Sequence, residues 1–499
     1  MKACVCRAFC ENDRVPPTDD LSREELIALI GSLVSTNESL TESNAVLRSR
    51  IAELERRLGR NSGNSSLPPS SDDRPGVNRA ARRAGRVSGR KRGKQPGAPG
   101  SGLAWVEPDV TEPYFPQGTC ECGQNLSQAA DAGVIRSHQV HDLPKVRARV
   151  TQHDLHRVRC GCGREHEADR PAHVAAAPTS YGPNVQALAV YLLVFQHLPV
   201  ERAALLIADL TGITPSVGYL HSTLARGAAA LETSVARIKD EISTAPVVGF
   251  DETTLRVGAA GRKMYVLSAN TSTHSLFWLG GRDLASFHAM GVLDAFTGIA
   301  VHDRYSVYDH PDFAHLAGHQ LCTAHLLRDL EDAAECYPTH EWPAQAQRAL
   351  RALIHAANTA RAAGHTQVPA RLRRKHTRLF HQAVLVGLSQ IPSVPGGRTV
   401  KQLPARALLE CLRDREADVL RFTRDTRVPP TNNISERGLR PEKTQQKISG
   451  RLPSLTTTRH RLTIRSYLHT AAQHKINLME ALRDAMTGNP WTPPALAPS

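Results

Sequence analysis

The stretch VVGFDETTLRV, residues 247–257, decides the fold because apolar and polar residues alternate in it over the length of a β-strand. A Gly-rich turn over residues 258–261 follows, and two further apolar runs, MYVLSANT (264–271) and HSLFWLG (274–280), come next. Apolar runs separated by turns predict a meander of three strands. Asp251 lies in the middle of the first strand, where a charge is costly unless it binds a metal ion or accepts hydrogen bonds.

Two more carboxylates are candidates for the same site. Asp303 follows a short apolar strand in GIAVHDRYSVY (298–308), and Glu436 lies in PPTNNISERGLRPEK (429–443), where Asn432 or Asn433 can cap a helix. Carboxylates from two neighbouring strands and one later helix are suited to hard divalent cations. The sequence leaves alternatives open at the helix, because Glu442 is an equal candidate and Glu436 could simply pair with Arg440.

Cations accompany these glutamates at spacings that place several on one helical face. They are Arg437, Arg440, Lys443 and Lys447. A carboxylate among cations suits a site that binds metal ions together with phosphate.

The distance along the chain between the carboxylates predicts an insertion. Asp251 and Asp303 are 52 residues apart, but Asp303 and Glu436 are 133 apart, which is too long for one strand-to-helix step. Residues from about 329 to 427 are rich in Ala, Leu and Arg at helical spacing, so we expect a helical insertion that could clamp DNA. Before it, Cys322 and His325 form a Cys-x-x-His pair. A packed cysteine with a histidine near the active site is favoured over a metal pair, because no second pair of ligands lies close in sequence.

The charge distribution indicates an acidic partner. The chain of 499 residues has 62 Lys and Arg against 48 Asp and Glu, a net charge of +14, and nine of the cations lie between Arg74 and Lys94 without any acid. Residues 61–103 are rich in Gly, Ser, Pro and Arg and are predicted to form a flexible linker. Its cations either keep the linker in solution or contact DNA phosphates, and the single sign of the run favours phosphates. The predicted contacts are Arg82, Arg83, Arg86, Arg90, Lys91, Arg92 and Lys94.

A heptad pattern in residues 20–60 predicts a coiled coil. Leucines recur every seven residues, and the intervening core positions hold Ile, Asn and Leu. The leucines are Leu26, Leu33, Leu40, Leu47 and Leu54. Asn37 and Asn44 at core positions favour a homodimer in fixed register, because a buried amide is satisfied opposite its twin. The alternative is an amphipathic helix packed on its own chain.

Two short cysteine pairs lie in residues 104–175, which we predict to be a zinc-binding domain. CECG contains Cys120 and Cys122, and CGCG contains Cys160 and Cys162, with an expected strand pair around residues 134–150 between them. Four thiolates match a tetrahedral structural Zn²⁺. His138, His141, His153 or His166 could replace one ligand, and reduced cysteines without metal are the alternative.

Residues 180–240 are predicted to form a helical module. Helices are expected over residues 181–197, 199–210 and 215–225, with Gly212 in the turn before the third and Thr214 as its N-cap. This is either a helix-turn-helix that reads DNA with the third helix or an ordinary helical hairpin. Neither a membrane-spanning segment nor a secretion signal is evident, which favours a cytoplasmic protein.

Taken in order, these motifs resemble those of the insertion sequence 66 family of bacterial transposases. The resemblance rests on the zipper, NSGNSS…PPSSD with RKRGKQPGAPG, the paired cysteines, YGPNVQALAVYLLVFQHLPVERAA, GFDET, VHDRYSVY, LCTAHLLRDL and TNNISERGLRPEK…KISG. It implies an α/β, ribonuclease-H-like core, a mixed sheet with flanking helices over residues 245–470, followed by a C-terminal helix and tail at 471–499. It also implies an Asp-Asp-Glu catalytic triad at Asp251, Asp303 and Glu436, and it assigns the cysteine pairs to a zinc-binding domain.

The function implied is DNA transposition in the bacterial cytoplasm, in association with the nucleoid. The expected chemistry uses two Mg²⁺ or Mn²⁺ ions to cleave the transposon ends and to join their 3′-hydroxyl groups to target DNA. Accessory proteins of the same element are further partners that the resemblance implies. A DNA-binding regulator, a metal-dependent nuclease without strand transfer, and an inactive copy of an element are the alternatives.

Overall fold

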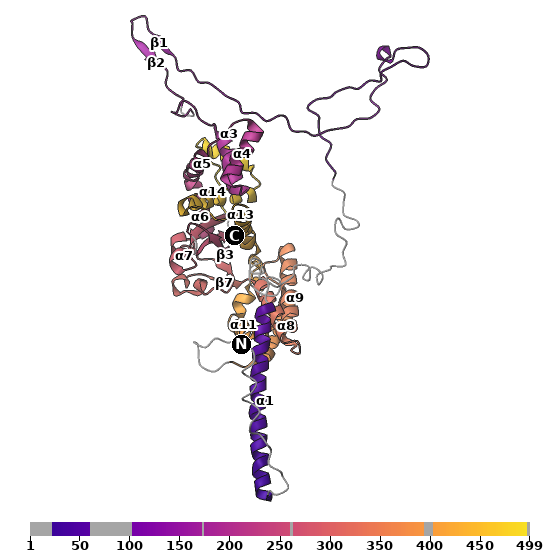
Figure 1. The fold of residues 1–499 in the computed structure, drawn as a ribbon, viewed down its shortest axis with the longest axis vertical. Coiled ribbons are helices and arrows are strands. Elements are labelled where there is room, and N and C mark those ends of the chain that lie inside the picture. The colour runs from indigo at the N-terminus through magenta and orange to yellow at the C-terminus, as the bar shows by residue number, and fades with distance from the viewer. Residues whose placement is uncertain (1–21, 60–101, 172–173, 260–262, 394–402, 497–499) are drawn as a thin grey trace, which may run out of the picture.

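The computed structural model describes residues 22–59, 102–171, 174–259, 263–393 and 403–496. The basic stretch, with the predicted DNA contacts from Arg82 to Lys94, lies outside the described residues. Figure 1 shows a body of helices around a sheet, from which α1 and the segment before α3 extend.

A mixed five-stranded sheet forms the centre of the body, in the order β5-β4-β3-β6-β7. The strands are β3 Val247–Arg256, β4 Lys263–Asn270, β5 Ser275–Gly280, β6 Ile299–His302 and β7 Gly318–Leu321. The predicted meander is confirmed, because β3 pairs antiparallel with β4 and β4 antiparallel with β5. The other two strands are parallel, with β6 alongside β3 and β7 alongside β6. β3 is therefore the central strand, and its neighbours approach it from both sides.

The two faces of the sheet pack against different helices. Alternate residues of β3, Val248 and Phe250, join a core with α6 Glu232–Ser243, α7 Leu284–Met290 and the turns after β6. The opposite face, which includes Leu255, packs against α13 Asn433–Ile448 and α14 Leu455–Gln473. The turns after β6 are the 3-10 helices η5 Ser306–Asp309 and η6 Pro311–Phe313.

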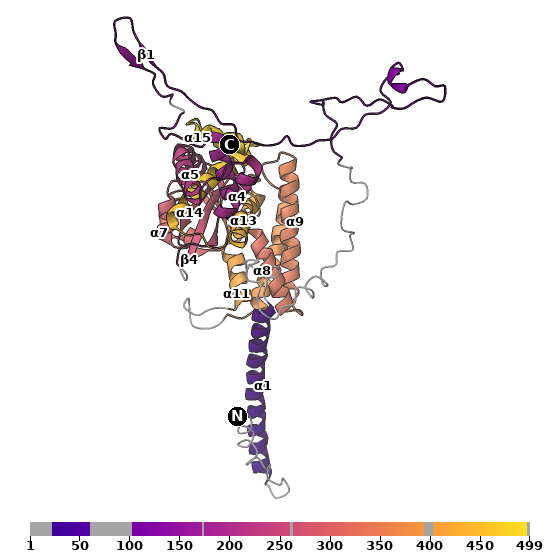
Figure 2. The ribbon, with the colours of Figure 1, turned by 45° about the horizontal axis from the view of Figure 1, so that its top comes forward.

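The expected helical insertion is present between β7 and α13. It begins earlier than predicted, at Thr323, because the strand ends directly before the first helix. Its elements are α8 Thr323–Cys336, α9 Trp342–Ala362, α10 Ala370–Gln390, α11 Pro404–Asp414, α12 Glu416–Val419 and the 3-10 turn η7 Arg421–Thr423. These helices lie beside the sheet (Figure 2), and their core around Trp342, Phe380 and Leu409 also includes Val301 of β6 and Leu321 of β7.

The helical module is built from the helical elements that lie directly before α6 in the chain. They are α3 Pro183–Val190, a π-helical turn η4 Tyr191–Phe195, α4 Val200–Thr211 and α5 Val217–Ala230. Gly212 lies in the turn as predicted, with a positive φ of 79°, but Thr214 is not the N-cap of the third helix. Ser216 caps it instead, because its side chain accepts a hydrogen bond from the Tyr219 amide. The module shares one core with α14 and α15 Leu478–Met486, so it does not pack as a separate unit.

The heptad segment forms one long helix, α1 Arg23–Gly59, which projects from the body beside α8 (Figure 1). Among its described side chains, several apolar ones are exposed rather than packed in a core. They are Ile27, Ile30, Leu33, Val34 and Leu40. An exposed apolar stripe favours an intermolecular partner over packing on the same chain.

Residues 102–171 extend over the body and have almost no buried side chains. The strand pair expected around residues 134–150 is wrong, since the described residues there are extended but unpaired. Their apolar side chains, such as Ile135 and Val140, are exposed and have no core to pack on. A short antiparallel hairpin forms later instead, from β1 Arg157–Arg159 and β2 Glu165–Glu167. A 3-10 turn, η3 Leu126–Gln128, follows the first cysteine pair. No helix among the described residues is long and apolar enough to cross a membrane.

Candidate active site

The site begins where α13 lies directly against β3. An added Cβ at Gly249 would lie 2.6 Å from both Asn432 Oδ1 and Ser435 Oγ, so only glycine permits this close approach. Asn432 precedes α13 as predicted for a cap, but its side chain makes no capping hydrogen bond. Its Nδ2 instead donates to the Phe250 carbonyl oxygen at 2.6 Å. The start of α13 is thereby fixed to the strand that carries Asp251.

Asp251 lies on the same face of β3 as Gly249, because side chains alternate along a strand. Burial raises the pKa of Asp251 well above its ordinary value, and the nearby charges of Glu252, Asp303 and Glu436 raise it further. Asp303 and Glu436 are therefore each close enough to Asp251 for their charges to affect it. A Glu252 amide hydrogen bond to Asp251 Oδ1, at 2.9 Å, is the opposing contribution.

Glu252 is a fourth carboxylate at this site, and the sequence interpretation did not single it out. Arg282 binds its Oε1, with N···O distances of 2.6 and 2.7 Å, and the Tyr308 hydroxyl donates to its Oε2 at 3.0 Å. Arg282 also lies 3.8 Å from Asp303 Oδ2 and stacks over the Tyr305 ring. Burial and Asp303 raise the pKa of Glu252, while Arg282 opposes the increase. The adjacent acids in GFDET were the available signal, but strand alternation places Glu252 on the other face.

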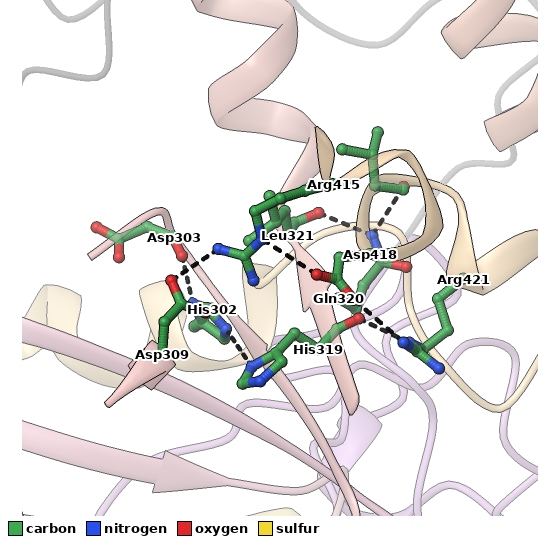
Figure 3. A network of polar contacts seen from close by, with 10 residues as sticks. His302, Asp303, Asp309, His319, Gln320, Leu321, Arg415, Asp418 and Arg421 are labelled. Carbon is green, nitrogen blue, oxygen red and sulfur yellow. Dashed lines mark hydrogen bonds and ion pairs between the residues drawn. The ribbon is translucent and has the colours of Figure 1, made fainter. Parts of the chain in front are cut away.

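Asp303 directly follows β6, and a polar network holds this end of the strand (Figure 3). The His302 ring contacts the Asp303 carbonyl oxygen through Nδ1 and His319 Nδ1 through Nε2, the latter at 3.0 Å. Arg421 donates to the His319 carbonyl at 2.7 Å, which connects β7 to the insertion. The Asp303 carboxylate itself accepts from the Tyr305 amide at 2.8 Å.

The same network contains a set of potential metal ligands, His302, Asp309 and His319, that already have protein partners. Their ligand atoms lie within 4.8 Å of one another. The rings of His302 and His319 are hydrogen-bonded to each other, and Asp309 forms an ion pair with Arg415 at 2.8 Å. Burial and His319 lower the pKa of His302 to about 3. We interpret this group as support for the Asp303 strand.

Glu436 lies in the first turn of α13 and faces the start of α8. Its Oε1 is buried without a hydrogen-bond partner, and His325 Nδ1 lies 3.9 Å away. Burial lowers the pKa of His325 to about 4, with Arg328 and Arg304 contributing, so this imidazole is neutral at pH 7. The alternative pairing of Glu436 with Arg440 does not occur among the ion pairs of the described residues.

Cys322 packs beside Glu436 and His325 at the strand-to-helix junction. Its Sγ accepts a hydrogen bond from the backbone N–H of Asn432 at 3.2 Å, and burial raises the pKa of the thiol to about 11. Metal ions bind the thiolate rather than the thiol. This geometry favours the packed cysteine near the active site over a Cys-x-x-His metal pair, although both ligand atoms lie within 4.8 Å of Glu436.

Glu442, the rival candidate on α13, points away from the carboxylates. It forms an ion pair with Arg465 of α14 at 2.9 Å, and both side chains are 5% exposed. Burial lowers the pKa of Lys443, while the nearby carboxylates of Asp251 and Glu436 favour its charged form. Arg437, Arg440 and Lys447 of the same helix are exposed.

These residues fit divalent cations. Several carboxylates share one small region, one of them with a strongly raised pKa, and Glu436 Oε1 is a buried acceptor that lacks a donor. Hard cations satisfy such oxygen clusters. Among the described residues, the ligand atoms of Asp251, Asp303 and Glu436 do not all lie within 4.8 Å of one another.

The cysteine pairs form two similar turns. Gly123 and Gly163 each have a φ of 88°, and each donates its amide to the carbonyl of the first cysteine at 2.8 Å. The amides of Cys122 and Cys162 lower the pKa of Cys120 and Cys160, respectively, which favours thiolates. All four cysteines are exposed, and the structure does not bring the two pairs together. The turn between β1 and β2 carries the second pair, on the side opposite the loop of the first (Figures 1 and 2).

The comparison with protein families decides the identity. A family model described as the Transposase IS66 family matches residues 178–459, which is more than half of the chain. The chain belongs to the IS66 transposase family. A second model, for a family of unknown function, matches residues 13–104 of the transposase. A search of curated proteins found no match. Family membership gives the chain a transposase role and implies DNA as partner and divalent metal ions as cofactor.

Proposed function

We propose that this transposase acts by Asp-Asp-Glu chemistry in a ribonuclease-H-like core, cleaving transposon ends and joining their 3′-hydroxyl groups to target DNA. The observation that carries the proposal is the electrostatic convergence of Asp303 and Glu436 on Asp251. A mixed five-stranded sheet with helices on both faces supports the proposed core. A regulator that only binds DNA would leave this costly group of carboxylates without a use.

We propose that Asp251, Asp303 and Glu436 would be the ligands of two Mg²⁺ or Mn²⁺ ions. When bound, such ions neutralise the charge that develops on the attacking and leaving oxygens of a phosphodiester. The protein's own part is to hold the carboxylates. Asn432 fixes α13 to β3, and the His302–His319 pair supports the chain at Asp303.

The neighbouring cations would position the DNA backbone. Lys443 lies close enough to Asp251 and Glu436 to be affected by their charges, and Arg437, Arg440 and Lys447 of the same helix are exposed. Arg282 holds Glu252 in an ion pair, which reduces the repulsion between Glu252 and Asp303. The cations from Arg82 to Lys94 are proposed as additional contacts that bind any DNA sequence.

The other segments have proposed roles in assembly. α1 would form a parallel homodimer through its heptad face, which would bring two transposon ends together. Cys120, Cys122, Cys160 and Cys162 would bind structural Zn²⁺ once the two turns meet, since each turn already favours thiolates. α4 and α5 would serve as a helix-turn-helix-like module. Action at the nucleoid in the cytoplasm, with accessory proteins of the same element, completes the proposal.

The substrate for a test is defined by the DNA that flanks the gene. A plasmid carrying matching inverted ends is incubated with the unmodified chain and with Asp303→Asn in the presence of Mg²⁺. We expect the variant to lose strand cleavage by at least about 10²–10³-fold, while it still binds the ends. Joined products support the transposase, whereas cleaved ends alone indicate a nuclease. Cleavage retained by Asp303→Asn would contradict the triad, and an unmodified chain that binds without cleaving would indicate a regulator or an inactive copy.

A further inference from the structure

The helical insertion has an unusual distribution of charge on α10. This helix of 21 residues contains five Lys and Arg and no Asp or Glu. Four of these cations are exposed and follow the spacing i, i+3, i+4 and i+7, which places them on one face of a helix. We call them the α10 basic stripe, and they are Arg371, Arg374, Lys375 and Arg378.

The charges of the stripe are not balanced within the part of the chain that the structure describes. None of the four forms an ion pair there, although exposed arginines elsewhere do. Arg413 pairs with Asp414 at 2.6 Å, and Arg483 pairs with Asp484 at 2.9 Å. A merely solvated helix usually mixes both signs, because like charges at i, i+4 repel each other. A continuous positive face is instead typical of surfaces that bind polyanions.

The opposite face of α10 holds the stripe rigidly on the insertion. Phe380, Ala383, Val384 and Gly387 are buried there. An added Cβ at Gly387 would lie 2.5 Å from Leu409 and 2.9 Å from Trp342, so the helices are in close contact. The cations therefore stand on a fixed support, which reduces the entropy cost of binding.

The start of α10 is connected to the segment that leads to Glu436. The Val368 amide donates to the Thr423 carbonyl at 3.0 Å, and the Thr426 amide donates to the Thr366 carbonyl at 2.9 Å. At the end of α9, the Arg361 guanidinium donates to the carbonyls of Thr426 and Val428, at 2.6 and 2.9 Å. This segment continues through Pro430, whose carbonyl accepts from Thr323, to the start of α13. The stripe thus has a defined position relative to the carboxylate site.

We infer that the α10 basic stripe binds the phosphate backbone of the DNA on which the carboxylate site acts. This deepens the proposed function and rests on it only in taking DNA as the substrate. The four cations span about 10 Å along the helix axis, so their long side chains can reach successive phosphates of one strand. The N-terminal end of α10 adds the positive end of a helix dipole to the same region. The stripe carries no sequence information and binds through counterion release.

The test measures the salt dependence of DNA binding by the full chain. The probe is a fluorescein-labelled duplex of mixed sequence, about three helical turns long (about 30 bp), titrated at several KCl concentrations and followed by anisotropy. Three variants are compared with the unmodified chain: R371Q/R374Q/K375Q/R378Q, the charge-conserving R371K/R374K/R378K, and R413Q/R483Q as a control with the same kind of exposed residue. All of them retain the stretch from Arg74 to Lys94, so that contribution is common to the whole set.

The association constant for DNA falls as the salt concentration rises. In the neutral stripe variant, the plot of log K against log salt should become less steep, by about 0.9 for each phosphate that the stripe no longer neutralises. The lysine variant should retain the slope, and the control should not change it. A neutral stripe variant with an unchanged slope and an unchanged thermal midpoint would overturn the inference. A control that lowers the slope equally would also overturn it. If the neutral variant is unstable, the single change R374Q provides the same test, and the slope is then expected to change by the contribution of about one phosphate. Cleavage by the unmodified chain is assayed in parallel, so its absence counts against the proposed function and not against the stripe.

Discussion

Two glutamates six residues apart on α13 show how one helix serves two different environments. Glu436, in the first turn, lies near Asp251 and has a buried oxygen without a donor. Glu442 is buried against Arg465, and its charge also acts on the partly buried Arg461 of α14. The first glutamate is held in a cluster of like charges and the second among opposite charges. An unbalanced charge indicates a ligand, whereas a balanced pair indicates a role in the fold.

The largest effect is expected from Glu436→Gln. The substitution keeps the shape of the side chain but removes a proposed metal ligand, so strand cleavage should fall by about 10²–10³-fold or more. Thermal stability should be unchanged or slightly higher, because one charge leaves a group of carboxylates that repel one another. Cleavage and the thermal midpoint are measured on the same preparation. A variant that cleaves DNA normally would show that the two glutamates do not differ as described.

The matched change, Glu442→Gln, should have the opposite pattern. It leaves the buried Arg465 without its carboxylate, and breaking a buried pair costs about 3–5 kcal/mol. Chemical unfolding should show this loss in stability, while the fraction that remains folded should still cleave DNA. The double variant E442Q/R465M should recover part of the stability, since it also removes one of the charges. A stable E442Q variant without cleavage would reverse the two roles.

A smaller effect concerns pH at the Glu442 end of the helix. Burial, with a contribution from Arg465, lowers the pKa of His469 to about 4. Because the folded state lowers this pKa from the ordinary 6.5, the stability is present above pH 6.5 and is lost as the pH falls toward about 4. His469→Gln should reduce the pH dependence of stability in this window by up to about 1.4 kcal/mol per pH unit.

The histidine prediction is checked by urea unfolding at several pH values between neutral and about 5. In this window the ring gains a proton in the unfolded state but stays largely neutral in the folded state. His310→Gln provides a control, because that ring lies in a more exposed turn, where its Nδ1 is 3.3 Å from Asp312 Oδ1. Equal pH dependence in His469→Gln and the unmodified chain would show that Arg465 and burial do not affect this ring as described.

Much of the fold could be predicted because local patterns were strong. The alternation in residues 247–257 predicted β3, and helical spacing predicted the insertion. Predictions failed where local signals competed. Thr214 and Ser216 are both good caps, but the helix begins after Ser216, whose side chain accepts from the Tyr219 amide. Apolar residues around 134–150 suggested strands, but nothing packs against them in the described structure.

The candidate site could be predicted as three separate carboxylates, but not as an arrangement. Glu252 was missed because two adjacent acids on a strand point to opposite faces of the sheet, and the sequence does not show which face provides a cation to pair with. Arg282 binds it from a turn 30 residues away. For the cysteine pairs, the local turn geometry follows from the sequence, through Gly123 and Gly163. That the two pairs come together around one metal ion stays a prediction.

The sequence by itself determined the elements of this transposase: residue periodicity specifies strands, helices and the heptad of α1, because each depends on neighbours within a few positions. The tertiary structure decided which charges meet. Glu436 and Glu442 have the same chemistry and lie on the same helix, and only packing against β3 on one side and α14 on the other separates them. The energy of a buried charge depends on groups distant in the chain, so the fold had to be known before Glu436 could be preferred.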